Sequence, residues 1–204
     1  MTALEHRKRL AAADRRQQIL EAAALLFVAQ GFEAVSMADI AQLLKVARPT
    51  VYSYFISPEA VLDSLLNDRL QGLWTRLEAQ IVALSAGTVS GAPPQMFAAL
   101  FEFLLGEHQT LALLHCGGGP SFRARRNAFL GELARRLERL RPGLQRSAAL
   151  PWLLTQLLDS VAFGAAALQP EEVSDLAQTL DIFIRGGVAA LNATRGAGET
   201  TPTG

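Results

Sequence analysis

Residues 46–55, VARPTVYSYF, decide the fold of this chain. They predict a tight turn at residues 45–47 and a short helix over residues 48–54, because proline is favoured in the first turn of a helix. Residues 37–44, directly before the turn, have the apolar spacing of another short helix. Two short helices joined by such a turn are typical of a helix-turn-helix, whose second helix enters the DNA major groove.

The flanking sequence continues the helical pattern, and no convincing alternation of apolar and polar residues predicts a strand. Ser36, with Asp39 three residues later, is a variant of the capping box and begins the first of the two short helices. Ser57 and Pro58 open a long helix. We therefore expect an all-α protein, with a three-helix N-terminal head joined to a C-terminal helical bundle and about nine helices in total.

The composition indicates a globular chain with no broad excess of either charge. Hydrophobic residues make up 50% of the 204 residues, and the formal net charge is +0. A small basic excess in the first 55 residues fits local contact with phosphates, although this excess taken alone favours a solvated helix face.

The expected compartment is the cytoplasm. Cys116 is the one cysteine, so no intrachain disulfide can form, which favours a reducing environment. Residues 1–16 lack the apolar segment of a signal peptide, and no run of about eighteen apolar residues predicts a membrane span.

Residues 16–66 resemble the DNA-binding head of the tetracycline-repressor (TetR) family. The matching positions are Ile19, Leu20, Ala23, Leu26, Phe27, Gly31, Phe32, Ser36, Ile40, Ala41, Val46, Thr50, Val51, Tyr52, Tyr54, Phe55, Ser57 and Glu59. We expect a helix-turn-helix domain over residues 1–56, with a basic arm over 1–14. An effector-binding and dimerisation domain over 57–195 and a flexible tail over 196–204 complete the expected organisation.

The resemblance implies a set of DNA-contacting residues. These are Ser36, Met37, Lys45, Arg48, Pro49, Thr50, Tyr52, Ser53 and Tyr54. Arg48 can donate two hydrogen bonds to a guanine edge or meet a phosphate, and the sequence does not separate these roles. Pro49 can touch a thymine methyl or simply begin the helix, and Tyr52 has packing within the head as its alternative.

Three positions depart from the family pattern. Lys45 stands where the family usually has glycine in the turn, Ala47 replaces the usual serine or threonine cap, and Pro58 replaces the usual lysine. These changes predict weaker or differently balanced DNA binding. Basic side chains near the N-terminus either compensate by contacting DNA or belong to a disordered tail; they are Arg7, Lys8, Arg9, Arg15 and Arg16.

Apolar stripes on the last two long helices predict a homodimer interface, because two helix-turn-helix units related by a two-fold axis read a palindrome. The predicted interface residues are Leu154, Leu157, Leu158, Val161, Ala165, Leu180, Phe183, Ile184, Gly187 and Leu191. Packing inside the protomer is the alternative use of the same residues.

The resemblance also implies a cavity for a small-molecule effector, built from apolar side chains and a few polar groups. The candidate lining residues are Trp74, Phe97, Phe101, His108, Phe122, Arg126, Phe129, Trp152, Gln156 and Phe163. The alternative for the aromatic members is ordinary core packing, and the alternative for the polar members is the surface.

These observations predict a homodimeric, ligand-responsive transcriptional repressor that leaves a palindromic operator when an effector binds, with no cofactor. Cys116 beside His115 lacks a third metal ligand or an orienting acid, so neither a catalytic nor a metal site is expected. The alternative is a helical dimer with a degenerate head that acts as an interaction or ligand-binding module. An all-α enzyme using Cys116 is a second alternative.

Overall fold

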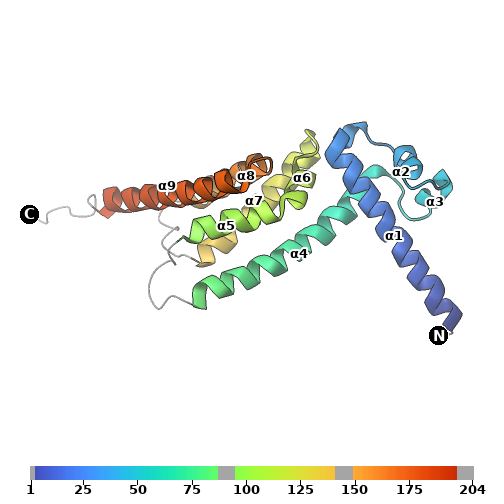
Figure 1. The fold of residues 1–204 in the computed structure, drawn as a ribbon, viewed down its shortest axis with the longest axis horizontal. Coiled ribbons are helices and arrows are strands. Elements are labelled where there is room, and N and C mark those ends of the chain that lie inside the picture. The colour runs from blue at the N-terminus through green and yellow to red at the C-terminus, as the bar shows by residue number, and fades with distance from the viewer. Residues whose placement is uncertain (1–2, 87–94, 141–148, 197–204) are drawn as a thin grey trace, which may run out of the picture. The chain divides into compact units, whose positions relative to one another are not determined.

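The computed structural model describes residues 3–86, 95–140 and 149–196, and these form nine α-helices and one short 3-10 helix (Figure 1). No strand occurs in the described ranges, so the expected all-α class is confirmed. The expected flexible tail, apart from Gly196, lies outside the described residues.

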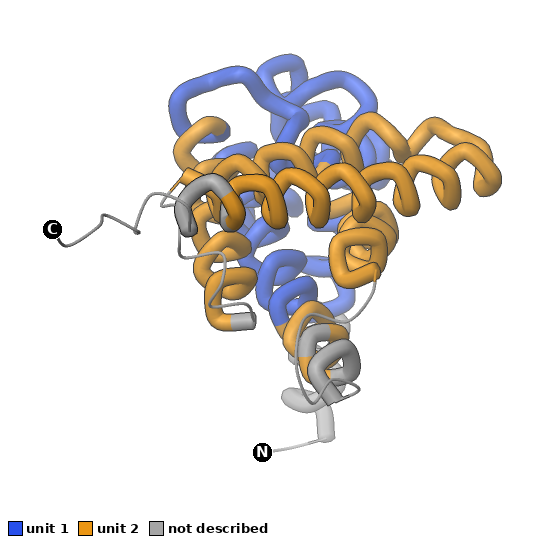
Figure 2. Tube along the Cα trace, turned by 90° about the vertical axis from the view of Figure 1, so that its left-hand side faces the viewer, with its two compact units in different colours: residues 1–74, 112–122 blue, residues 75–111, 123–204 orange. Residues whose placement is uncertain are grey.

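The first of two compact units comprises residues 1–74 and 112–122 (Figure 2). It contains α1 (Ala3–Gln30), η1 (Phe32–Ala34), α2 (Met37–Leu43), α3 (Arg48–Tyr52) and the start of α4 (Pro58–Ala86). Its core is apolar and includes the buried side chains of Ile19, Leu20, Phe27, Ile40, Val51 and Leu62.

The second unit comprises residues 75–111 and 123–204. Its helices are the rest of α4, α5 (Met96–Gly106), most of α7 (Pro120–Leu140), α8 (Leu150–Ala165) and α9 (Pro170–Gly196), while α6 (His108–His115) is divided between the units. Helix α5 packs against both α8 and α9, and its apolar sequence accounts for its burial between them. The functional domain boundaries expected at residues 56 and 195 stay a prediction.

Helix α1 is longer than the sequence pattern predicts, because it begins at Ala3 and includes the segment expected to be a basic arm. Residues 3–15 contain no glycine or proline and are rich in alanine, arginine and leucine, which have high helix propensity. The later start of this helix was expected because its amphipathic stripe begins later in the sequence. A helix does not need such a stripe where the propensity of its residues already favours it.

The N-terminus of α5 depends on a carboxylate from another helix. Gln95 has a left-handed backbone (φ 71°) and provides no side-chain cap. Instead the buried Asp181 of α9 accepts hydrogen bonds at Oδ1 from the backbone N–H groups of Phe97 (3.0 Å) and Ala98 (3.3 Å). Its Oδ2 lies 2.7 Å from Nε of Arg185. A buried charge thus satisfies two donors that the helix itself cannot satisfy.

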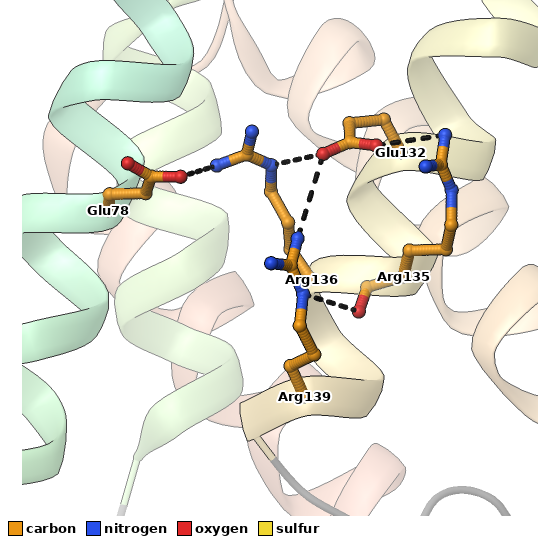
Figure 3. Close-up of polar contacts among 5 residues, drawn as sticks. All are labelled: Glu78, Glu132, Arg135, Arg136 and Arg139. Atoms are coloured by element: carbon orange, nitrogen blue, oxygen red, sulfur yellow. Dashed lines mark hydrogen bonds and ion pairs between the residues drawn. The ribbon is translucent and has the colours of Figure 1, made fainter.

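The arginine-rich face of α7 is a network within the second unit (Figure 3). Arg136 lies between Glu132, whose Oε1 is 2.7 Å from its Nε, and Glu78 of α4, which accepts from its Nη1. Arg135 pairs with the other oxygen of Glu132 at 2.8 Å. The side chain of Arg136 is only 14% exposed, so this arginine joins α7 to α4 more firmly than a solvated face would.

No single helix in the described ranges is long and apolar enough to span a membrane. Helices α5 and α6 meet the length and hydropathy criteria only as a pair, and they are bent by 71° relative to one another.

Candidate nucleic-acid interface and ligand sites

Helices α2 and α3 pack on a small shared core. Ile40 and Ala41 of α2 and Val51 of α3 are buried, as is Phe55 directly after α3. In the connecting turn, the backbone N–H of Val46 donates to the carbonyl of Ala41 at 3.0 Å. The two short helices are therefore held at a fixed angle by apolar contacts and by turn hydrogen bonds.

The predicted capping box of α2 is confirmed. The backbone N–H of Ser36 donates to Oδ2 of Asp39 at 2.8 Å, and the Asp39 N–H donates back to Oγ of Ser36 at 3.4 Å. The hydrogen bond from the Ser36 hydroxyl lowers the pKa of Asp39, with further contributions from the Ser36 backbone and from the charge of Arg48. Asp39 is therefore a carboxylate at neutral pH and lies near the start of α3.

Lys45 adopts the left-handed conformation that its position in the turn predicts, with φ 55°. Left-handed backbone brings the Cβ of a non-glycine residue close to the following carbonyl. Ala47, the N-cap of α3, makes no side-chain capping hydrogen bond. Both departures from the family pattern therefore have a local energetic cost in this head.

Replacing Lys45 with glycine is expected to raise the free energy of unfolding by about 0.5–1 kcal/mol, because relief of the left-handed strain exceeds the extra flexibility of glycine. Urea denaturation followed by circular dichroism measures the change. Lys45→Ala keeps the Cβ while removing the charge, so it is the control and should give no gain. Equal stabilisation by both variants would assign the effect to charge.

One side of α3 is open to solvent. Arg48, Pro49, Tyr52 and Ser53 are exposed, while Thr50 and Tyr54 are half-buried. The hydroxyl of Ser53 donates to the carbonyl of Thr50 at 2.7 Å, so it is occupied within its own helix. Exposed arginine, tyrosine and proline side chains on a short rigid helix provide donors and apolar surface suited to base edges and phosphates.

The remaining residues predicted to contact DNA differ in their exposure. Ser36 and Lys45 are exposed at the two ends of α2, but the Met37 side chain is buried in the core of the head. Met37 can therefore offer its backbone N–H at the helix start, whereas its side chain supports the fold.

Arg16, considered with the basic arm in the sequence, is held inside the first unit. Its guanidinium carbon lies 5.3 Å from the centre of the Phe55 ring, and its terminal nitrogens contact the Ser64 hydroxyl and, at 3.7 Å, the Asp68 carboxylate. These contacts tie α1 to α4 and to the end of the helix-turn-helix. The sequence offered no signal for them, since the partners are about 40 to 50 positions away.

The candidate effector residues are distributed over both units. Trp74 and Phe122 belong to the first unit and the others to the second. Phe97, Phe101 and Phe129 are fully packed, Phe122 is also buried, Arg126 and Gln156 are half-buried, and Trp152 and Phe163 are exposed. The exposed His108 is the member of this set that lines a described cavity.

That cavity lies in the second unit, where the junction of α5 and α6 meets the α8–α9 turn. Its volume is about 370 Å³, and it is lined by Leu105, His108, Ala165, Ala166, Leu168, Pro170 and Val173. The lining is apolar except for the imidazole, and four of its seven residues are exposed, so this cavity opens to solvent. The sequence pattern predicts aromatic lining residues, whereas the lining of this cavity is aliphatic apart from His108.

The predicted interface residues divide into two groups. Leu154, Leu158, Ala165, Leu180 and Ile184 are buried within the protomer, Leu157 and Val161 are half-buried, and Phe183, Gly187 and Leu191 are exposed. Other large apolar side chains on α8 and α9, Leu153 and Ile182, are 55% and 67% exposed. The amphipathic stripe did not separate the inward from the outward residues, because both helices carry large apolar side chains at exposed as well as at buried positions.

Cys116 is an ordinary partly buried thiol. It lies 3.1 Å from the carbonyl of Leu113, to which it donates a hydrogen bond, and burial raises its pKa to about 11. The nearby Glu33 carboxylate raises the pKa further, while the backbone N–H of Cys116 opposes the shift. A nucleophilic cysteine needs the opposite environment.

Alkylation of Cys116 is expected to be slow at pH 7–8 and to accelerate about tenfold per pH unit up to at least pH 9.5, because only the thiolate reacts and it forms as the pH approaches 11. Stopped-flow reaction with a maleimide measures the rate. The chain unfolded in urea serves as the control, in which the rate should level off near the usual thiol pKa. A plateau below pH 9 in the folded protein would contradict the assignment.

Comparison with known proteins gives matches at two scales. Residues 19–65 match the family model described as bacterial regulatory proteins, tetR family. The HTH-type transcriptional regulator LuxR of Vibrio harveyi is 38% identical over 61 residues, an alignment that spans 30% of this chain and 30% of the relative.

Solved structures extend the similarity to the whole fold. The fatty acid degradation regulator FadR from Bacillus halodurans is 19% identical, covers 85% of this chain and 95% of its own, and superposes with a TM-score of 0.61. The TetR family transcriptional regulator PfmR from Thermus thermophilus is 22% identical, with coverage of 83% and 94% and a TM-score of 0.59. At these identities the likeness concerns the arrangement of helices.

Proposed function

We propose that this chain, whose residues 19–65 match the family model described as bacterial regulatory proteins, tetR family, is a sequence-specific DNA-binding regulator of transcription. In this proposal it binds a palindromic operator as a homodimer and represses transcription. A small-molecule effector bound in the second unit then releases it from DNA.

The observation that carries the proposal is the exposed face of α3. Arg48, Pro49 and Tyr52 are open to solvent on a helix whose opposite face is fixed by Val51 and by the capped helix α2. A rigid helix that presents a guanidinium and a phenol at its surface is suited to direct readout in the major groove.

The short length of the recognition helix α3 favours a dimer. The five residues of α3 reach too few base pairs for a specific site, whereas two copies on a two-fold axis read two half-sites. The exposed Leu153, Ile182, Phe183 and Leu191 on α8 and α9 give the second unit an apolar surface that a second copy would cover.

Effector release requires a link between two sites. The cavity of about 370 Å³ is large enough for a small apolar ligand. Helix α4 is continuous from residue 58 to residue 86 and belongs to both units, so a shift of its second half would reorient the head. The spacing of the recognition helices would then change, and the affinity for the operator would fall.

Affinity selection from a pool of random DNA duplexes tests the proposal with the purified full chain. We expect enrichment of a palindrome whose half-sites are one helical turn or more apart. A screen for compounds that displace the protein from that duplex then tests effector release. Ala166→Trp, which fills the cavity from an exposed position, should abolish displacement while retaining DNA binding.

The degenerate-head alternative has its own support in the left-handed Lys45 and the uncapped start of α3. Under that alternative no sequence is enriched even at low salt, where electrostatic contacts to phosphates are strongest. The protein would then act as a dimeric interaction or ligand-binding module.

A further inference from the structure

A short contact within the first unit joins the segment before α2 to the turn before α7. The backbone N–H of Phe32 donates to the carbonyl of Cys116 at 2.8 Å, and the N–H of Gly118 donates to Oε1 of Glu33 at 3.0 Å. Gly31, with φ 83°, provides the reversal after α1 that directs this segment toward the turn. We refer to Phe32, Glu33, Cys116 and Gly118 as the clasp.

The Glu33 carboxylate lies in front of the N-terminus of α7, where it accepts from Gly118, two positions before the helix begins. The N-terminus of a helix carries unsatisfied N–H groups and favours a negative charge. Hydrogen bonds from the backbone N–H groups of Glu33 itself, of Gly118 and of Gly119 lower the pKa of Glu33, so the group is ionised at neutral pH. Residue 33 thus places a charge beside the turn that leads into α7, a helix that begins 87 positions later, at Pro120.

Aromatic packing reinforces the same contact. The Phe122 ring, in the first turn of α7, lies 5.0 Å from the Phe32 ring, which lies 5.2 Å from the buried Phe27 ring of α1. Gly117 allows this arrangement, because a Cβ at that position would lie 2.4 Å from Cε2 of Phe122. A Cβ at Gly119 would meet no atom within 4 Å.

The clasp lies within the first unit, close in sequence both to α2 and to the start of α7. Three residues after Glu33, Ser36 begins the capping box of α2. In the other direction α7 continues without interruption into the second unit, where Phe129, Leu133 and Leu137 are buried and Arg136 is paired with Glu78. Displacement of α7 would therefore act on the start of α2 through the clasp, in addition to any effect through α4, to which Arg136 joins α7.

We propose that the clasp is the coupling contact through which the position of α7 and the occupancy of the helix-turn-helix by DNA influence each other, with Glu33 as its positioning residue. This inference rests on the proposed DNA-binding function. By linkage, if α7 affects DNA affinity, then DNA must affect the turn that begins α7 to the same extent.

Amide hydrogen exchange in the full chain tests the clasp first without DNA. Glu33→Ala is expected to speed exchange of the Gly118 N–H about two- to fivefold, as loss of an exposed charged hydrogen bond predicts. Glu21→Ala, which removes an exposed carboxylate from α1, is the control and should leave Gly118 unchanged. Equal exchange in Glu33→Ala and in the native chain would overturn the proposal.

The second measurement repeats the exchange with the selected duplex bound. We expect DNA to slow exchange at Phe32 and Gly118 in the native chain and in Gly119→Ala, but not in Glu33→Ala or Gly117→Ala, although all four chains bind the duplex. DNA binding with no change at the turn of the native chain would overturn the coupling. Failure of every chain to bind any selected duplex would instead overturn the proposed function.

Discussion

Replacing Arg48 with alanine is expected to weaken binding of the selected palindrome about 10- to 100-fold per dimer, because each protomer loses a cationic donor at the start of its recognition helix. Arg48 is exposed and precedes the packed Val51 by one helical turn, so its removal leaves the core of the head intact. Fluorescence anisotropy with a labelled duplex measures the affinity.

The pattern of the loss distinguishes the two roles left open for Arg48. If it reads a guanine, substitution of that base pair no longer matters in the variant, and discrimination at one position disappears. If it meets a phosphate, affinity falls equally for all sequences and the salt dependence weakens. Arg139→Ala on α7, which removes the same charge from a 69% exposed side chain, should bind like the native chain. If Arg48→Ala bound the selected palindrome as tightly as the native chain does, Arg48 and the start of α3 would not contact the DNA.

Replacing Asp181 with alanine is expected to lower the free energy of unfolding by about 3 kcal/mol. The carboxylate is 1% exposed and accepts from the backbone N–H groups of Phe97 and Ala98, which no other described residue satisfies in its place. Its loss leaves two donors of α5 without an acceptor and removes the ion pair with Arg185. Urea denaturation at fixed protein concentration measures the effect.

Two further variants define the cause. Asp181→Asn keeps an acceptor oxygen and should lose roughly half as much stability. Asp175→Ala removes an exposed carboxylate from the same helix and should stay within about 0.5 kcal/mol of the native chain. If Asp181→Ala were no less stable than Asp175→Ala, the cap on α5 would not contribute to folding.

The helix-turn-helix was predictable because its signals are local. The capping box of Ser36 and Asp39, the turn at Lys45 and the buried positions of Ile40 and Val51 all lie within sixteen residues of one another. Local propensity, capping and apolar spacing agree over this segment, which is the condition under which a sequence specifies its structure most clearly.

The second unit was predictable in class but not in detail. Apolar periodicity indicates which residues are buried, but it does not show whether they surround a cavity or fill one. Phe97 and Phe101 fill the interior, whereas small residues such as Ala165 and Ala166 leave the space. The functions assigned to these residues stay predictions.

Contacts between distant parts of the chain had no sequence signal. Glu33 and Gly118 are 85 positions apart, and Asp181 is 84 positions from Phe97. From the sequence alone, the charged residues Glu33 and Asp181 would both be expected on the surface. Their roles depend on which helix N-terminus the fold brings near each of them. Such pairs become visible only when the tertiary arrangement is known.

The most direct test of sequence-specific DNA binding is the ratio of two dissociation constants, for the selected palindrome and for a scrambled duplex of equal length, at physiological salt. A specific regulator binds the palindrome at least about 1,000-fold more tightly, and this ratio is the result we expect for the native chain. A ratio below about tenfold, with both constants falling together as salt is lowered, would reduce the interaction to phosphate contact and contradict the proposal that α3 reads a sequence.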